Sequence, residues 1–166
     1  VKFFDCINHK TVYRKFLEFV KKAKDAGIKY DEKATEIFKE YLNSYAFNKQ
    51  VLKLNDNPEY FTNNKLRGGK FNWAENDLKE KFYGEKIENE SLGVPQGGAL
   101  SCLISNLILH EVDEAVLGNE TTTGLLYIRY CDDMILANIS KSKCLNALER
   151  YQNSVYKSKL LFHKPQ

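Results

Sequence analysis

Two adjacent aspartates between two short apolar segments constrain this 166-residue chain more than any other feature. The segments Leu125–Tyr130 and Met134–Ile139 predict strands, with Cys131, Asp132 and Asp133 between them. One interpretation makes the aspartates the turn of a β-hairpin, although such turns favour Asn-Gly or Asp-Gly because their central residues need positive φ. The other is a cation site, because Mg²⁺ prefers carboxylate oxygens and its charge would relieve the repulsion between two adjacent carboxylates. These residues alone leave both interpretations open.

A glycine-rich segment is the second unusual feature. Residues 93–101 read Gly-Val-Pro-Gln-Gly-Gly-Ala-Leu-Ser, and an apolar helix is predicted over Leu100–Leu117. Glycine lets a backbone approach a ligand closely, and exposed amides at a helix N-terminus suit a phosphate or a base pair. An ordinary connection between a loop and a helix could have the same composition. Inside the helix, we expect the side chain of Asn106 to be satisfied by a hydrogen bond.

Apolar periodicity and capping residues predict the other elements. Strands are expected at Val1–Phe4 and Leu160–Phe162, and a surface loop at residues 51–69. Helices are expected from Thr11 to about Lys24, from Asp31 through Tyr45, from a capping box at Asn72–Glu75 to about Phe82, and from Ser140 to about Tyr156, with a polar connection over Gly84–Glu90. This order approximates a split βαββαβ arrangement: an α+β fold with an RRM-like antiparallel sheet, helices on one face and an inserted helical segment.

Composition predicts one folded domain and no particular chemistry. The hydrophobic fraction of 43% is enough to bury a core and excludes wholesale disorder, and the net charge of +3 does not by itself indicate nucleic-acid binding. The sequence contains no apolar run of about 18 residues and no charged-then-apolar leader, so neither a membrane span nor a signal peptide is predicted. Four scattered cysteines without a C-x-x-C pair predict reduced thiols in a cytoplasmic protein rather than a zinc site.

Three motifs in order resemble those of bacterial reverse transcriptases of the group II intron and retron-like type. The family pattern places G-[IV]-P-Q-G-x-x-x-S-P ahead of Y-x-D-D, and this chain has the loop at residues 93–101 and Tyr-Cys-Asp-Asp at residues 130–133. The opening Val-Lys-Phe-Phe-Asp-Cys-Ile-Asn-His is similar to the tail of the first motif, D-x-x-x-F-F-D-x-I-[DN]-H. Two positions depart from the pattern, because Cys102 stands where proline is usual and Cys131 where alanine is commoner.

The resemblance implies a role for five residues. Asp132 corresponds to the metal-binding catalytic aspartate, and Asp133 is its neighbour in the same metal site. Gln96 and Gly97 match the loop that lines the nascent base pair and the template. Phe4 matches the bulky residue that packs against the sugar and excludes a ribose 2′-hydroxyl, unless the preceding phenylalanine takes that role or Phe4 is only a core residue.

The resemblance also implies an activity and its partners. It predicts an RNA-directed DNA polymerase that uses two Mg²⁺ ions, with Mn²⁺ as a possible substitute, an RNA template, a DNA primer and deoxynucleoside triphosphates. Residues 1–166 would form the palm, with part of the fingers or an insertion at about 28–90 and without the thumb or the N-terminal fingers. The first catalytic aspartate would fall one or two positions before Val1, so we expect residues 1–166 alone to be inactive.

Three other interpretations of the sequence remain. An intron maturase would use the palm mainly to bind RNA and assist splicing. A phage-defence reverse transcriptase would polymerise without a conventional template, and the long segment before Gly93 is compatible with it. The third is a plain α+β domain with an acidic turn.

Overall fold

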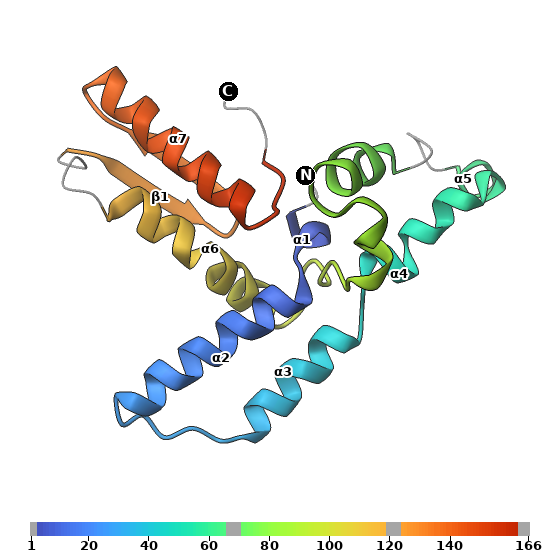
Figure 1. The fold of residues 1–166 in the computed structure, drawn as a ribbon, viewed down its shortest axis with the longest axis horizontal. Coiled ribbons are helices and arrows are strands. Elements are labelled where there is room, and N and C mark those ends of the chain that lie inside the picture. The colour runs from blue at the N-terminus through green and yellow to red at the C-terminus, as the bar shows by residue number, and fades with distance from the viewer. Residues whose placement is uncertain (1–2, 66–70, 119–123, 163–166) are drawn as a thin grey trace.

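The computed structural model describes residues 3–65, 71–118 and 124–162 (Figure 1). In chain order the elements are the helices α1 (Phe3–Cys6), α2 (His9–Asp25), α3 (Lys33–Asn43) and α4 (Phe47–Gln50), the 3₁₀ helix η1 (Leu52–Asp56), α5 (Pro58–Asn63), the π-helix η2 (Ala74–Tyr83), the 3₁₀ helix η3 (Gly84–Asn89), α6 (Ser101–Leu117), the strands β1 (Leu126–Tyr130) and β2 (Asp133–Ala137), and α7 (Lys141–Lys157). The fold of the described residues is therefore α+β, with a two-stranded antiparallel sheet.

The sheet lies against two long helices that pack on each other, α6 and α7 (Figure 1). One face of the hairpin is half-buried, and its side chains Tyr127, Met134 and Leu136 join the hydrophobic core. The opposite face is exposed along its whole length. This face carries Leu126, Ile128 and Tyr130 of β1 opposite Ala137, Ile135 and Asp133 of β2. The helices thus cover one side of the sheet and leave the other open.

The N-terminal half of the chain packs against the other side of α6. Helix α2 contacts α6, and the buried Lys15 forms an ion pair with Glu111 between them. Helix α3 runs beside α2, where the rings of Phe16 and Phe38 stack with centroids 4.1 Å apart (Figure 1). The segment from α4 to η3 surrounds an aromatic cluster in which the Phe47 ring stacks on Trp73 at 5.4 Å. The long segment before Gly93 is thus a folded part of the molecule.

The structure confirms the predicted hairpin and the four long helices α2, α3, α6 and α7, with ends shifted by a few residues. The helix expected from Thr11 begins at His9, with Asn8 as its N-cap. The Oδ1 atom of Asn8 accepts a hydrogen bond from the backbone N–H of Thr11 at 3.1 Å. The capping box before η2 also differs. The N-cap makes no side-chain bond there, and Glu75 instead accepts a hydrogen bond from Asn55 at 3.0 Å.

Four predictions about secondary structure are wrong. Phe3–Cys6 forms a helical turn rather than a strand, while Val1 and Lys2 lie outside the described residues. Residues 160–162 form no strand. Part of the expected loop at 51–69 is helical in η1 and α5, and the expected connection over Gly84–Glu90 is largely a 3₁₀ helix. For Phe3–Cys6 the physical reason is that a short apolar run fits a buried helical turn as well as a strand.

Candidate active site

The hairpin connection consists of two residues, Cys131 and Asp132. Tyr130 pairs with Asp133 across the strands, so Asp132 lies at the tip and Asp133 is the first residue of β2. Cys131 has φ +52°, whereas Asp132 is not among the residues with positive φ. Positive φ at the first turn position alone is the sign pattern of a type II′ turn, where glycine is usual. Asp132 is half-buried and Asp133 is exposed.

Arg129 connects this turn to helix α6. Its Nε and Nη2 donate to the two carboxylate oxygens of Asp113 at 2.7 and 2.5 Å. Its Nη1 donates to Asn106 Oδ1 at 3.1 Å and to the carbonyl oxygen of Cys131 at 2.8 Å. Tyr127 also donates to Asp113, at 2.6 Å. Only 10% of the Arg129 side chain is exposed, so its bidentate ion pair with Asp113 is shielded from solvent. The hydrogen bond from Arg129 to the carbonyl oxygen of Cys131 holds the backbone of the turn.

The charges at this site shift the pKa values of the surrounding groups. Hydrogen bonding to Asp113 raises the pKa of Arg129, and burial together with the same carboxylate raises the pKa of Tyr127. Burial raises the pKa of Tyr151 on α7, where Arg129 opposes the shift and the carboxylates of Asp113, Asp132 and Asp133 add to it. Slight burial, the Cys102 thiol and the Asp132 carboxylate raise the pKa of Cys131. The carboxylates of Asp132 and Asp133 therefore both affect the pKa of Tyr151 on helix α7.

Two glycines give the loop before α6 its shape. Gly93 has φ +94°, and a Cβ atom there would lie 2.6 Å from Cβ of Phe47, so only glycine fits. Its N–H donates to the carbonyl oxygen of Ile7 at 2.8 Å. Gly97 has φ +74° with open space around it, and the neighbouring Gln96 is exposed. The loop is thus fixed at its start and open to solvent at the Gln-Gly pair.

Helix α1 and the start of α2 hold the same loop. The N–H of Val94 donates to the carbonyl oxygen of Phe4 at 3.0 Å. His9 donates from Nε2 to the carbonyl oxygen of Gly93 at 2.6 Å, because a carbonyl can only accept. The ring of His9 is buried, and burial lowers its pKa below the ordinary value of 6.5. A neutral histidine therefore ties the first motif to the glycine-rich loop.

A family model described as reverse transcriptase (RNA-dependent DNA polymerase) matches residues 1–164. The chain belongs to the reverse transcriptase family. Neither a search of curated proteins nor a search of solved structures returned a significant match.

The structure links the first reverse transcriptase motif to the glycine-rich loop, and the end of that second motif to the hairpin turn. The backbone of Phe4 contacts Val94, which links the first motif to the loop. The Sγ atoms of Cys102 and Cys131 lie 3.9 Å apart, which links the start of α6 to the turn. The ring of Phe4 is half-buried and packs edge-on against Phe3 at 5.1 Å. Among the described residues, no hydrogen bond, ion pair or ring contact joins Phe4, Gln96 or Gly97 to either aspartate.

The turn offers this reverse transcriptase two carboxylates for a metal ion. No group of three or more His, Cys, Asp and Glu side chains that could hold a metal is found within residues 3–65, 71–118 and 124–162. Mg²⁺ in phosphoryl-transfer sites is commonly held by one or two carboxylates, with water and substrate phosphates as the other ligands. Asp132 and Asp133 fit that requirement, because their oxygens are the donors Mg²⁺ prefers and Asp133 is open to solvent.

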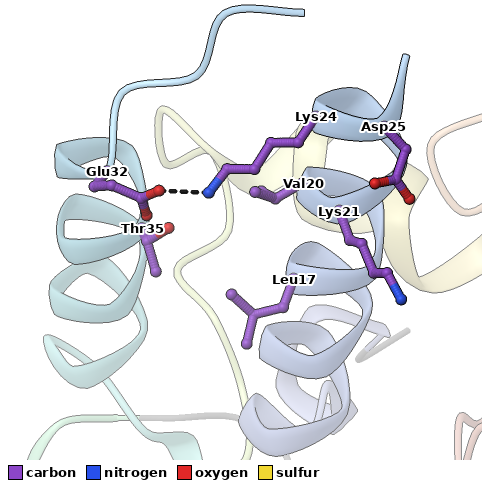
Figure 2. Close-up of a pocket in the computed structure, with 7 residues that line it drawn as sticks. All are labelled: Leu17, Val20, Lys21, Lys24, Asp25, Glu32 and Thr35. Carbon is purple, nitrogen blue, oxygen red and sulfur yellow. Dashed lines mark hydrogen bonds and ion pairs between the residues drawn. The ribbon is translucent and has the colours of Figure 1, made fainter. Parts of the chain in front are cut away.

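A separate pocket of about 340 Å³ lies between α2 and α3 (Figure 2). Its lining residues are Leu17, Val20, Lys21, Lys24, Asp25, Glu32 and Thr35. Figure 2 shows the ion pair of Lys24 with Glu32 spanning it. None of these residues belongs to the three motifs.

Sequence reasoning missed Arg129, Tyr127 and Asp113. A signal was present, because Tyr127 and Arg129 alternate with Leu126, Ile128 and Tyr130 on the strand, and a charged residue on the inward face needs a partner. Asp113 is the matching acid on helix α6. Asn106 was expected to be satisfied by a hydrogen bond, and its bond to Arg129 confirms this.

Proposed function

We propose that this chain carries the catalytic hairpin of an RNA-directed DNA polymerase of the bacterial group II intron or retron-like type. One observation carries the proposal: Asp132 lies at the tip of a hairpin whose turn backbone is bonded to Arg129 and whose Cys131 thiol lies beside the start of α6. A solvated acidic turn would not need these supports. They hold a carboxylate in one place, which is what a metal-dependent transfer requires.

Asp132 and Asp133 are the proposed ligands of divalent cations. When bound, two such ions stabilise the attacking and leaving oxygens of the phosphoryl group during nucleotidyl transfer. The chain itself holds the carboxylates at fixed positions: the ion pair of Arg129 with Asp113 fixes the turn, and α6 supports that pair. Asp133, exposed on β2, keeps one side of the site open for substrate phosphates.

The open face of the sheet supports the proposed binding of primer and template. It carries Tyr130, 81% exposed, beside Asp133, and no element among the described residues covers it. Gln96 and Gly97 are exposed in the loop that precedes α6, as a surface for a nascent base pair requires. In this proposal Phe4, next to that loop, limits the sugar to deoxyribose.

Primer extension by the natural full-length protein tests the proposed function. With an RNA template, a DNA primer and Mg²⁺, we expect incorporation of deoxynucleotides, which stops when EDTA removes the metal and resumes when Mg²⁺ or Mn²⁺ is restored. Ribonucleotides should be incorporated at least about ten times more slowly, because a bulky side chain beside the sugar rejects the extra hydroxyl. Extension without a template would favour the phage-defence alternative. RNA binding without any extension would favour the maturase alternative.

A further inference from the structure

Two thiols face each other beside the catalytic turn. Cys102 is in the first turn of α6, and Cys131 is the first residue of the hairpin connection. Their Sγ atoms are 3.9 Å apart; Cys102 is exposed and Cys131 is half-buried. All four cysteines are free, and neither residue of this pair is fully buried.

We propose that Cys102 and Cys131 form a reversible disulfide that switches off nucleotidyl transfer, an inference whose inhibitory part rests on the proposed polymerase function. The bond would connect the start of α6 directly to the residue that precedes Asp132. It would therefore act on the position of the proposed metal ligand.

The chemistry needs a low-molecular-weight disulfide such as oxidised glutathione. The sulfur of one cysteine attacks this disulfide, and a mixed disulfide forms as the first glutathione leaves. The second cysteine then attacks the protein sulfur of the mixed disulfide, and the second glutathione leaves. The two cysteines lose two electrons and two protons, and the two glutathione molecules gain them. A dithiol such as dithiothreitol reverses both steps.

Closing the bond brings the two sulfur atoms closer together and restricts the geometry of both residues. A disulfide has a sulfur–sulfur length of about 2.05 Å, well below the present separation of 3.9 Å. Helix α6 is anchored beside Cys102, because Ser101 is buried and donates to the carbonyl oxygen of Pro95 at 2.5 Å. Any backbone adjustment that the bond requires is therefore taken up by the turn, which carries Asp132, against the hydrogen bond from Arg129 to the Cys131 carbonyl oxygen. A displacement of about 1 Å in a catalytic group can cost about 100-fold in rate.

The other cysteines do not offer such a pair. Cys6 is the last residue of α1 and is buried in the core. Cys144 is half-buried on α7 and donates to the carbonyl oxygen of Leu136 at 3.8 Å. Cys144 is therefore a suitable control, because it is a free thiol of the same domain outside the turn.

The experiment equilibrates the natural full-length protein with mixtures of oxidised and reduced glutathione. Peptide mapping by mass spectrometry reports the bond, and primer extension reports the activity. We expect a peptide pair joined through Cys102 and Cys131, an activity loss of at least about tenfold, and full recovery with dithiothreitol. The activity of the Cys102→Ser variant should be the same under oxidising and reducing conditions, and the Cys144→Ser variant should remain as sensitive to the oxidant as the natural protein.

Each contrary outcome has its own meaning. Absence of the joined peptide pair at oxidising equilibrium would overturn the inference, and so would a complete Cys102–Cys131 bond with unchanged activity. Sensitivity of the Cys102→Ser variant to the oxidant would also overturn it. A reduced protein without any primer extension would overturn the proposed function and the inhibition together, while the peptide map would still decide whether the bond forms.

Discussion

At the scale of single residues, the guanidinium of Arg129 contacts both carboxylate oxygens of Asp113, the amide oxygen of Asn106 and the carbonyl oxygen of Cys131. Removing it would leave the carboxylate of Asp113, only 23% exposed, without its charged partner. Leaving such a charge unpaired is costly, whereas a surface ion pair contributes little. Arg129 is thus a positioning residue that acts through the backbone of the turn.

Replacing Arg129 by methionine tests this role. We expect the free energy of unfolding to fall by about 2–4 kcal/mol, because a partly buried carboxylate loses its partner. Chemical denaturation measures the change. Arg14→Met is the matched control, because Arg14 forms an exposed pair with Glu18 at 2.6 Å and should cost less than about 0.5 kcal/mol. Equal effects of the two substitutions would contradict the assigned role.

The double replacement Arg129→Met with Asp113→Leu refines the same test. It removes both charges, so we expect it to be less destabilising than Arg129→Met alone. Primer extension should stay impaired in the double variant, because the bond to the Cys131 carbonyl is still absent. Full recovery of activity would mean that the turn does not need Arg129.

Sequence patterns located the two aspartates and the glycine-rich loop, because these residue types are unusual where they stand. The pairing of Arg129 with Asp113 was not predicted, since it joins a strand to a helix and depends on how they pack. The same holds for Cys102 and Cys131, the two departures from the family pattern, which meet only in the folded chain. The proposed roles of Phe4, Gln96, Gly97, Asp132 and Asp133 remain predictions.

At the scale of elements, local patterns in the sequence were sufficient to predict the hairpin and the long helices. The helix α6 is rich in buried apolar side chains, and the hairpin alternates between half-buried and exposed side chains. The strand expected at Val1–Phe4 is a helical turn over its described residues, and the strand expected at Leu160–Phe162 does not form. A strand needs a pairing partner, which a few residues of local sequence do not specify. In α1 the carbonyl of Phe4 instead accepts hydrogen bonds from Ile7 and Val94.

The contact of α2 with the glycine-rich loop predicts a pH dependence. The pKa of His9 lies below 6.5 in the folded chain because the ring is buried, so between the two values the unfolded chain binds more protons. The contribution of His9 to the free energy of unfolding should therefore be fully present above about pH 6.5. It should be lost as the pH drops from there through the lower folded-state pKa. Urea denaturation between pH 5 and pH 8, about 1.5 pH units on either side of the ordinary histidine pKa, measures this fall.

Two variants separate His9 from the other histidines. His9→Gln should weaken the dependence on pH in that range, because it removes the buried imidazole. His110→Gln is the control, because the side chain of His110 is 39% exposed on α6 and its replacement leaves His9 in place. An unchanged pH profile in the His9→Gln variant would show that another group is responsible.

At the scale of the whole molecule, the described elements form a hairpin layer, a pair of helices α6 and α7 behind it, and a helical N-terminal half that holds the glycine-rich loop (Figure 1). The first motif, the glycine-rich loop with the start of α6, and the hairpin turn are thereby linked from three parts of the chain. No helix among the described residues is both long and apolar enough to cross a membrane. The open sheet face is where we place the primer and the template.

The most direct test of the account is the rate of single-nucleotide addition by the natural full-length protein and its Asp132→Asn variant. Primer–template affinity is measured in parallel, and Asp25→Asn, which changes an exposed carboxylate at the end of α2, is the control. If Asp132 holds the catalytic metal, the rate falls by about 100-fold or more, while affinity and the control remain within about twofold of the natural protein. An Asp132→Asn variant that adds nucleotides at the natural rate would contradict the account.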